Sequence, residues 1–129
     1  MIRDPDFAND GWHLLSAEDR HAAHPDSFHI PNEHERRSLT PGDMAQLLFE
    51  ISFDDPEDPA SVERMWVYVT ESEAGSYIGV LINRPRLIPE NDSLWEGAEL
   101  PFRAEHVMSW VAGDGSALPV KQRTSWPRA

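Results

Sequence analysis

A change in the spacing of apolar residues near Met44 constrains the fold of this chain more than any other feature. From there, apolar and polar side chains alternate with a period of two, in MAQLLFEISF and then in ERMWVYVT and SYIGVLIN. This alternation is typical of β-strands that bury one face. The turn-forming segment ESEAG predicts that the last two runs form a hairpin. The sequence therefore predicts an antiparallel sheet.

Two further segments complete the expected sheet. AELPFRA fits another strand, and Pro101 within it restricts that strand to a sheet edge or a bulge. EHVMSWV fits one helical turn followed by a short last strand. Gly79 inside SYIGVLIN predicts a bulge or a sharp bend. We expect a small antiparallel meander, or partly open barrel, of four to five strands between about residues 44 and 112.

Helical signals are confined to the N-terminal third. Ser16 is suited to cap a helix at about residues 17–23, which Pro25 would end. Pro31 suits the first turn of a second short helix at about residues 32–38. With the strands that follow, these helices predict a β-dominated α+β fold.

Length and composition limit the organisation of the chain. Its 129 residues predict a single domain, with an N-terminal arm and helical cap (1–43), a β-barrel-like body (44–112) and a C-terminal tail (113–129). The absence of cysteine excludes disulfides, thiolate metal sites and cysteine nucleophiles. The sequence shows neither a secretory signal nor an apolar run of about 20 residues, so we expect a cytoplasmic protein that does not enter a membrane.

The formal net charge of −12 bears on the choice of partner. A negative field repels nucleic acid and anionic lipid, whereas it attracts a basic protein and accelerates its association. The acidity could also serve only solubility. The candidate partner contacts are four acids of the FDDPEDPASVE segment and an aromatic residue of a later loop: Asp54, Asp55, Glu57, Asp58 and Trp95. Two prolines and the lack of glycine argue against a calcium loop in the acidic segment.

Four histidines are concentrated in DRHAAHPDSFHIPNEHERR: His21, His24, His29 and His34. They could bind a metal together with nearby carboxylates if the chain folds back after Pro25. Their spacing matches no zinc motif, however. Two other interpretations remain open: a cluster that gains charge as the pH falls, or a polar, partly exposed surface.

One family resemblance rests on the strand region. ERMWVYVTESEAGSYIGVLINRP and LWEGAELPFRAEHVMSW resemble a family of small bacterial domains of unknown function with the pattern MWV.V, G.L.N.P, a glycine-led strand and a closing V..W. The matching positions are Met65, Trp66, Val67, Gly79, Leu81, Asn83, Pro85, Gly97, Phe102, Val107 and Trp110. Arg84 departs from the pattern, where an acidic or variable residue is expected. The resemblance covers about residues 40–112 and implies a barrel-like core but no activity.

No catalytic motif accompanies these features. The chain lacks GxSxG, a phosphate-binding loop and GxGxxG. The sequence therefore favours a non-enzymatic binding module without a cofactor, such as an immunity-type inhibitor of a basic toxin. The alternative is a small enzyme, or a metal- or small-ligand-binding protein, that uses residues 21–34. A regulatory domain of a larger pathway cannot be separated from the first hypothesis, and the oligomeric state is left open.

Overall fold

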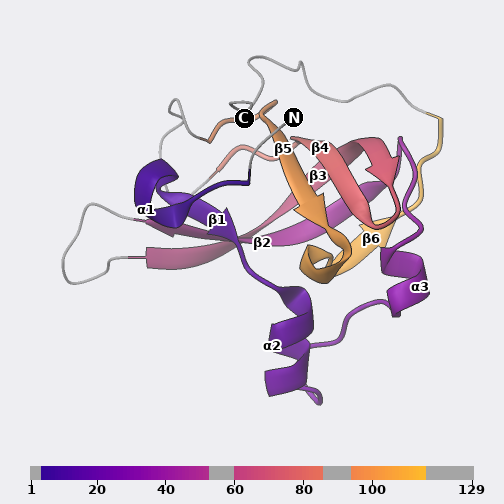
Figure 1. The fold of residues 1–129 in the computed structure, drawn as a ribbon, viewed down its shortest axis with the longest axis horizontal. Helices are drawn as coiled ribbons and strands as arrows, with labels where there is room; N and C mark the ends of the chain where they lie inside the picture. The colour runs from indigo at the N-terminus through magenta and orange to yellow at the C-terminus, as the bar shows by residue number, and fades with distance from the viewer. Residues whose placement is uncertain (1–3, 53–59, 86–93, 116–129) are drawn as a thin grey trace.

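The computed structural model describes residues 4–52, 60–85 and 94–115, and it has a β-dominated α+β fold. Its antiparallel sheet curls into a partly open barrel (Figure 1). The elements in chain order are α1 (Phe7–Asp10), β1 (Trp12–Leu14), α2 (Ala17–Ala23), α3 (Glu33–Arg36), β2 (Met44–Ser52), β3 (Ala60–Glu73), β4 (Ser76–Leu81), β5 (Glu99–Arg103), the 3-10 helix η1 (Ala104–His106) and β6 (Ser109–Val111). None of the helices in these ranges combines the length and the apolar character that crossing a membrane requires.

β2 is the strand on which the sheet closes. The strands follow the order β1-β2-β3-β4-β5, and β6 returns to pair with β2. β1 pairs with residues 49–51 of β2, and β6 pairs with residues 44–46 on the same edge. The two short strands therefore lie end to end along β2, which joins both ends of the described fold to its centre.

The main hydrophobic core lies inside the curl of the sheet. It contains Leu47, Phe49 and Ile51 from β2 and Met65, Val67 and Val69 from β3, all at most 1% exposed. Aromatic pairs add contact across it, with ring centroids 5.6 Å apart for Trp12 and Phe49 and 5.0 Å apart for Tyr77 and Phe102. The predicted alternation therefore identifies the buried face correctly.

A second, smaller cluster packs α2 against the outer face of β2. Leu48, which the alternation pattern assigns to the polar face, is fully buried there with Ala17, Phe28 and Met108. Its burial follows from the segment after α2, which brings Phe28 onto this face. Phe53, which continues the alternation of Leu47, Phe49 and Ile51 in the sequence, lies outside the described residues.

The helices agree with the sequence in place but only partly in length. α2 spans Ala17–Ala23 as predicted, and the Ser16 hydroxyl accepts a hydrogen bond from the Asp19 backbone. α3 is shorter than the predicted 32–38 because the chain leaves the helix at Arg37, which allows Leu39 to enter the core. α1 and β1 were not expected.

The bulge predicted at Gly79 is found beside the pair that Gly79 forms with Val69, and the extra residue is on the partner strand. The irregularity in the ladder lies between Val69 and Glu71 on β3, the strand opposite Gly79. At Gly79 itself, a Cβ would lie 3.0 Å from the Tyr68 carbonyl oxygen and 3.1 Å from the Phe102 ring. Glycine is therefore required for close packing between strands. Pro101 lies on β5 at the end of the strand order, as predicted.

Candidate functional site

The candidate site lies on β3, which is longer than either of its neighbours. Residues 60–68 pair with β2, whereas β4 pairs with residues between 67 and 73. The two ladders overlap only at Val67 and Tyr68. Each half of β3 therefore has one edge that no neighbouring strand of the described fold covers.

The free edge in the second half of β3 is closed by the segment that leads into β2. The Gly42 N–H donates to the Val69 carbonyl, and the Val69 N–H donates to the Asp43 carbonyl, both at 2.9 Å. The Ser72 hydroxyl donates to the Leu39 carbonyl at 2.8 Å. This segment thus takes the place of a neighbouring strand.

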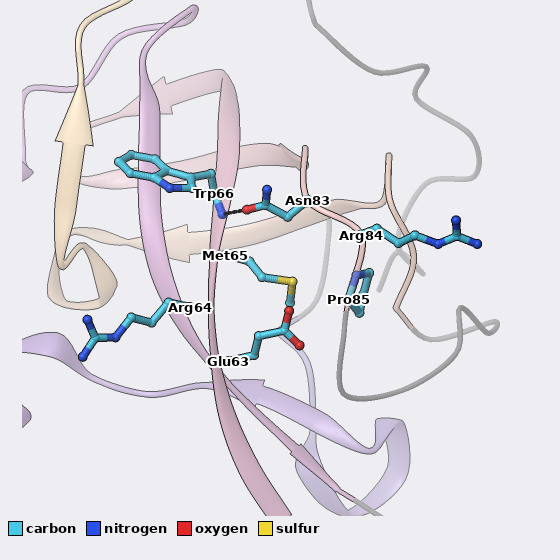
Figure 2. Close-up of a pocket in the computed structure, with 7 residues that line it drawn as sticks. All are labelled: Glu63, Arg64, Met65, Trp66, Asn83, Arg84 and Pro85. Atoms are coloured by element: carbon cyan, nitrogen blue, oxygen red, sulfur yellow. Dashed lines mark hydrogen bonds between the residues drawn. The ribbon is translucent and has the colours of Figure 1, made fainter.

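Among the described residues, the free edge in the first half of β3 has backbone hydrogen bonds on the β4 side at Trp66 alone. The Trp66 carbonyl accepts from the Ile82 N–H at 3.0 Å. The Trp66 N–H donates to the side-chain oxygen of Asn83 at 2.6 Å (Figure 2). Asn83 therefore provides the last rung of the ladder, after β4 has ended at Leu81.

A hollow of about 610 Å³ opens where the chain after β4 diverges from β3. It is lined by residues 63–66 on one side and 83–85 on the other. Trp66 and Arg64 project to one side of β3, whereas Met65 and Glu63 project to the other, towards Pro85; the Arg84 side chain extends away from β3 (Figure 2). The residues that line the hollow thus include one carboxylate, of Glu63, and two arginines, Arg64 and Arg84, whereas Met65 and Pro85 are buried in its wall.

A second hollow, of about 330 Å³, lies between α2, α3, the β3–β4 turn and η1. Charges of both signs line it, from Glu18, Glu33, Arg37, Arg103 and Glu105. The neighbouring Arg36, 6% exposed, donates to Glu18 and to the carbonyls of Pro31 and Ala104. Arg36 therefore ties α2, α3 and η1 together, which gives this region a structural role.

His106, in η1 beside this hollow, is the one histidine among the described residues whose pKa is clearly displaced. Burial and the nearby Arg103 guanidinium lower its pKa to about 4, although the Glu105 carboxylate acts in the opposite direction. Its Nδ1 accepts a hydrogen bond from the Arg103 N–H at 2.9 Å, which requires that this nitrogen carries no proton. The neutral ring thereby caps the turn between β5 and β6.

The structure does not gather the four N-terminal histidines. His21 Nδ1 lies 2.6 Å from the Phe28 carbonyl oxygen, and His24 ends α2. The side chains of His24, His29 and His34 are exposed. In the described part of the chain, no three side chains of His, Cys, Asp or Glu are grouped so that they could hold a metal ion.

The predicted partner contacts have two different positions. Asp54, Asp55, Glu57 and Asp58 lie in residues 53–59, outside the described residues. Trp95 is only 7% exposed, so little of its surface is accessible to a partner. Its indole nitrogen is buried and makes no hydrogen bond within the described ranges. The open edge of β3 was not predicted, because an alternating pattern does not specify how far a neighbouring strand extends.

Comparison with known proteins provides no relative. No protein-family model matches the chain, and neither the curated proteins nor the solved structures gave a match. The resemblance to the small bacterial domains therefore stays a prediction, and function must be argued from the geometry and charge described above.

Proposed function

We propose that this protein is a non-enzymatic binding module that engages a basic protein, as an immunity-type inhibitor of a basic toxin would. The formal net charge of −12 is the observation that carries this proposal. Such a charge on a small protein accelerates encounter with a positively charged partner and disfavours nucleic acid and anionic membranes. We place this activity in the cytoplasm.

The charge distribution supports the proposal. Residues 4–36 contain eight acidic residues and two arginines, and one of these, Arg36, is buried and paired with Glu18. The acids are Asp4, Asp6, Asp10, Glu18, Asp19, Asp26, Glu33 and Glu35. The arm and helices therefore contribute strongly to the negative field that would steer a basic partner.

The proposed direct contacts are the four acids between β2 and β3. Asp54, Asp55, Glu57 and Asp58 are consecutive in chain order with only Pro56 among them, so their carboxylates concentrate charge. They directly precede β3, which carries the open edge described above. In an inhibitor, these carboxylates would occupy the positions at which a basic toxin binds phosphate groups.

The test is affinity capture followed by kinetics. The immobilised chain is exposed to lysate of its native host, and the captured protein is purified. We expect a basic protein whose association rate constant falls at least about tenfold between about 50 and 300 mM NaCl. Capture of no basic protein, or an association rate that is independent of salt, would contradict the proposal.

A pair of charge-matched variants tests the proposed contacts. The first combines Asp54→Asn, Asp55→Asn, Glu57→Gln and Asp58→Asn. The second neutralises four exposed acids elsewhere, with Asp19→Asn, Asp26→Asn, Glu71→Gln and Glu73→Gln. Both lose the same net charge, so both slow association, but only the first should also accelerate dissociation. Equal dissociation rates would show that residues 53–59 are not the contact surface.

A further inference from the structure

We propose that Asp114 is a modification site, at which the folded protein converts aspartate to isoaspartate without an enzyme. The sequence contains two Asp–Gly pairs, Asp10–Gly11 and Asp114–Gly115. Glycine after aspartate favours this reaction, because a residue without a Cβ leaves its backbone nitrogen accessible to the preceding side chain. The structure holds the two pairs differently, and this inference does not depend on the proposed function.

The reaction needs no reactant other than water. The glycine nitrogen attacks Cγ of the protonated aspartate side chain and forms a new N–Cγ bond, while the carboxyl hydroxyl group and the amide proton leave as water. Water then opens the resulting five-membered succinimide at one of its two carbonyl carbons. Opening at the side-chain carbon regenerates aspartate. Opening at the main-chain carbon gives isoaspartate, in which the backbone runs through the side chain and is longer by one methylene group.

The Asp114–Gly115 pair is accessible to this reaction in the folded state. Both residues are exposed, beyond the end of β6 at Val111. The Gly115 N–H donates no hydrogen bond within the described ranges. A Cβ built on Gly115 would have no atom within 4 Å, so the space around this residue is open. The attack therefore requires no hydrogen bond of the Gly115 N–H to break.

The Asp10–Gly11 pair is similar in backbone conformation but is held by the fold. The φ of Gly11 is +79°, and that of the second glycine in the other pair is +86°. However, the Gly11 N–H donates to the Phe7 carbonyl at 3.0 Å, and the Gly11 carbonyl accepts from the Ser52 N–H at 2.8 Å. The Asp10 carboxylate accepts from the Asp6 N–H at 2.7 Å. Ring closure here therefore requires local opening of α1.

Other aspartates among the described residues lack this combination. Asp4 precedes Pro5, which has no N–H. After Asp26, the Ser27 N–H donates to the His24 carbonyl at 3.2 Å. Residues with larger side chains follow the remaining ones, Asp6, Asp19 and Asp43. Asp114 is therefore the described aspartate that the fold protects least.

The modified pair lies immediately after a close contact of the fold. The Gly113 N–H donates to the Asp43 side chain at 2.8 Å, and a Cβ on Gly113 would lie 2.5 Å from the Gly42 carbonyl oxygen. The chain is thus held against the turn before β2 at this residue. The added methylene at Asp114 would redirect the chain beyond this contact and leave the contact itself in place.

The test compares native full-length protein with the same protein unfolded in guanidinium chloride, both incubated at neutral pH and physiological temperature. Trypsin releases one pair in residues 4–20 and the other in residues 104–121. Electron-transfer mass spectrometry distinguishes isoaspartate from aspartate in each peptide. Folding should slow the reaction at Asp114 by less than about threefold and at Asp10 by at least about tenfold. Equal protection of the two sites by folding would overturn the proposal.

Two matched substitutions assign the signal to its residue. Asp114→Glu keeps the charge, but ring closure would then form a six-membered ring, which is much slower. The isoaspartate signal in residues 104–121 should therefore disappear. Asp10→Glu is the control and should leave that signal unchanged. A signal that persists in the Asp114→Glu variant would overturn the assignment to Asp114.

Discussion

The two halves of β3 belong to one strand but differ in what covers their free edge. In the second half, residues 39–43 run alongside and bond to Val69 and Ser72. In the first half, the last hydrogen bond on the β4 side that the described residues make is the one from the Trp66 N–H to the side chain of Asn83. The free edge of the second half is thus covered by a segment of the same chain, whereas no described segment covers the edge of the first half between Val62 and Arg64. The difference shows that an irregular segment, here residues 39–43, can bond to one edge of a strand where the neighbouring strand is absent.

The open half also carries features that limit indiscriminate pairing. Arg64 is exposed beside the edge, and charged residues at sheet edges discourage association between identical copies. Val67 and Val69, in the closed half, are fully buried. The first half therefore has an exposed charged side chain, Arg64, on its outer face. On its inner face it packs Met65, which is 1% exposed, into the core.

The largest expected effect is a loss of stability in acid at η1, where the Ala104 N–H donates to the Gly75 carbonyl in the turn that follows the closed half of β3. Burial and Arg103 lower the pKa of His106 from 6.5 to about 4. Between these values the unfolded state binds a proton that the folded state does not, so stability falls as the pH decreases. The contribution is about 3 kcal/mol at neutral pH and is lost by about pH 4. Urea unfolding measured from pH 7 to pH 4 provides the check.

His106→Asn is the control for this effect. The Asn side-chain oxygen can still accept the Arg103 N–H, but it does not titrate. The native protein should therefore lose about 3 kcal/mol relative to the variant over this pH range, which removes the contribution of other titrating groups. Parallel pH profiles for the two proteins would mean that His106 is not the group responsible.

Removing the Tyr77 hydroxyl should loosen the segment that closes the second half. That hydroxyl donates to the Arg36 carbonyl at 2.6 Å and accepts from the Leu39 N–H at 3.2 Å. Tyr77→Phe keeps the ring stacked on Phe102 but leaves a buried donor and acceptor unpaired, which costs about 2 kcal/mol. Denaturant unfolding measures the loss, and amide exchange should accelerate at Gly42 and Val69. Unchanged exchange at both amides would contradict the assigned role of residues 39–43.

A smaller effect is expected where the ladder ends. Asn83→Ala removes the acceptor of the Trp66 N–H, and we expect a loss of about 1 kcal/mol in the free energy of unfolding. The open edge would then begin at Trp66. Asn83→Asp retains a side-chain oxygen and should recover most of the loss in urea unfolding. If both variants are equally unstable, the Asn83 side chain does not act as the last rung.

The smallest effect is expected at Arg64. Its side chain is exposed, so Arg64→Gln should change the free energy of unfolding by less than about 0.5 kcal/mol. Removing the charge should increase self-association through the open edge, which analytical ultracentrifugation can follow. A large loss of stability would show that Arg64 supports the fold and that this half is less independent than proposed.

Local sequence patterns predict much of the fold. The period-two alternation identifies the strands and the buried face that carries Leu47 and Met65, and Ser16 with Pro25 gives the bounds of α2. α1 and β1 escape prediction because, unlike the equally short α3, which Pro31 indicates, they combine short length with no pattern or proline signal that the sequence analysis used. They are fixed by tertiary contacts, above all by the burial of Trp12 against Phe49.

The candidate site could not be predicted, because it depends on where strands stop pairing. Nothing in the residues around Arg64 distinguishes an edge covered by β4 from an edge beyond its end. Asn83 was identified within a motif, but its bond to Trp66 depends on the register between β3 and β4. The buried position of Trp95 similarly depends on three-dimensional packing.

The end-to-end arrangement of β1 and β6 along β2 has a consequence for synthesis on the ribosome. β1 emerges before β2, so residues 49–51 can pair at once, whereas residues 44–46 wait for Ser109–Val111. Contacts between segments far apart in sequence form late, because the intervening chain must first be ordered. During translation, the edge of β2 at Met44 therefore remains exposed until nearly the whole described chain has left the exit tunnel.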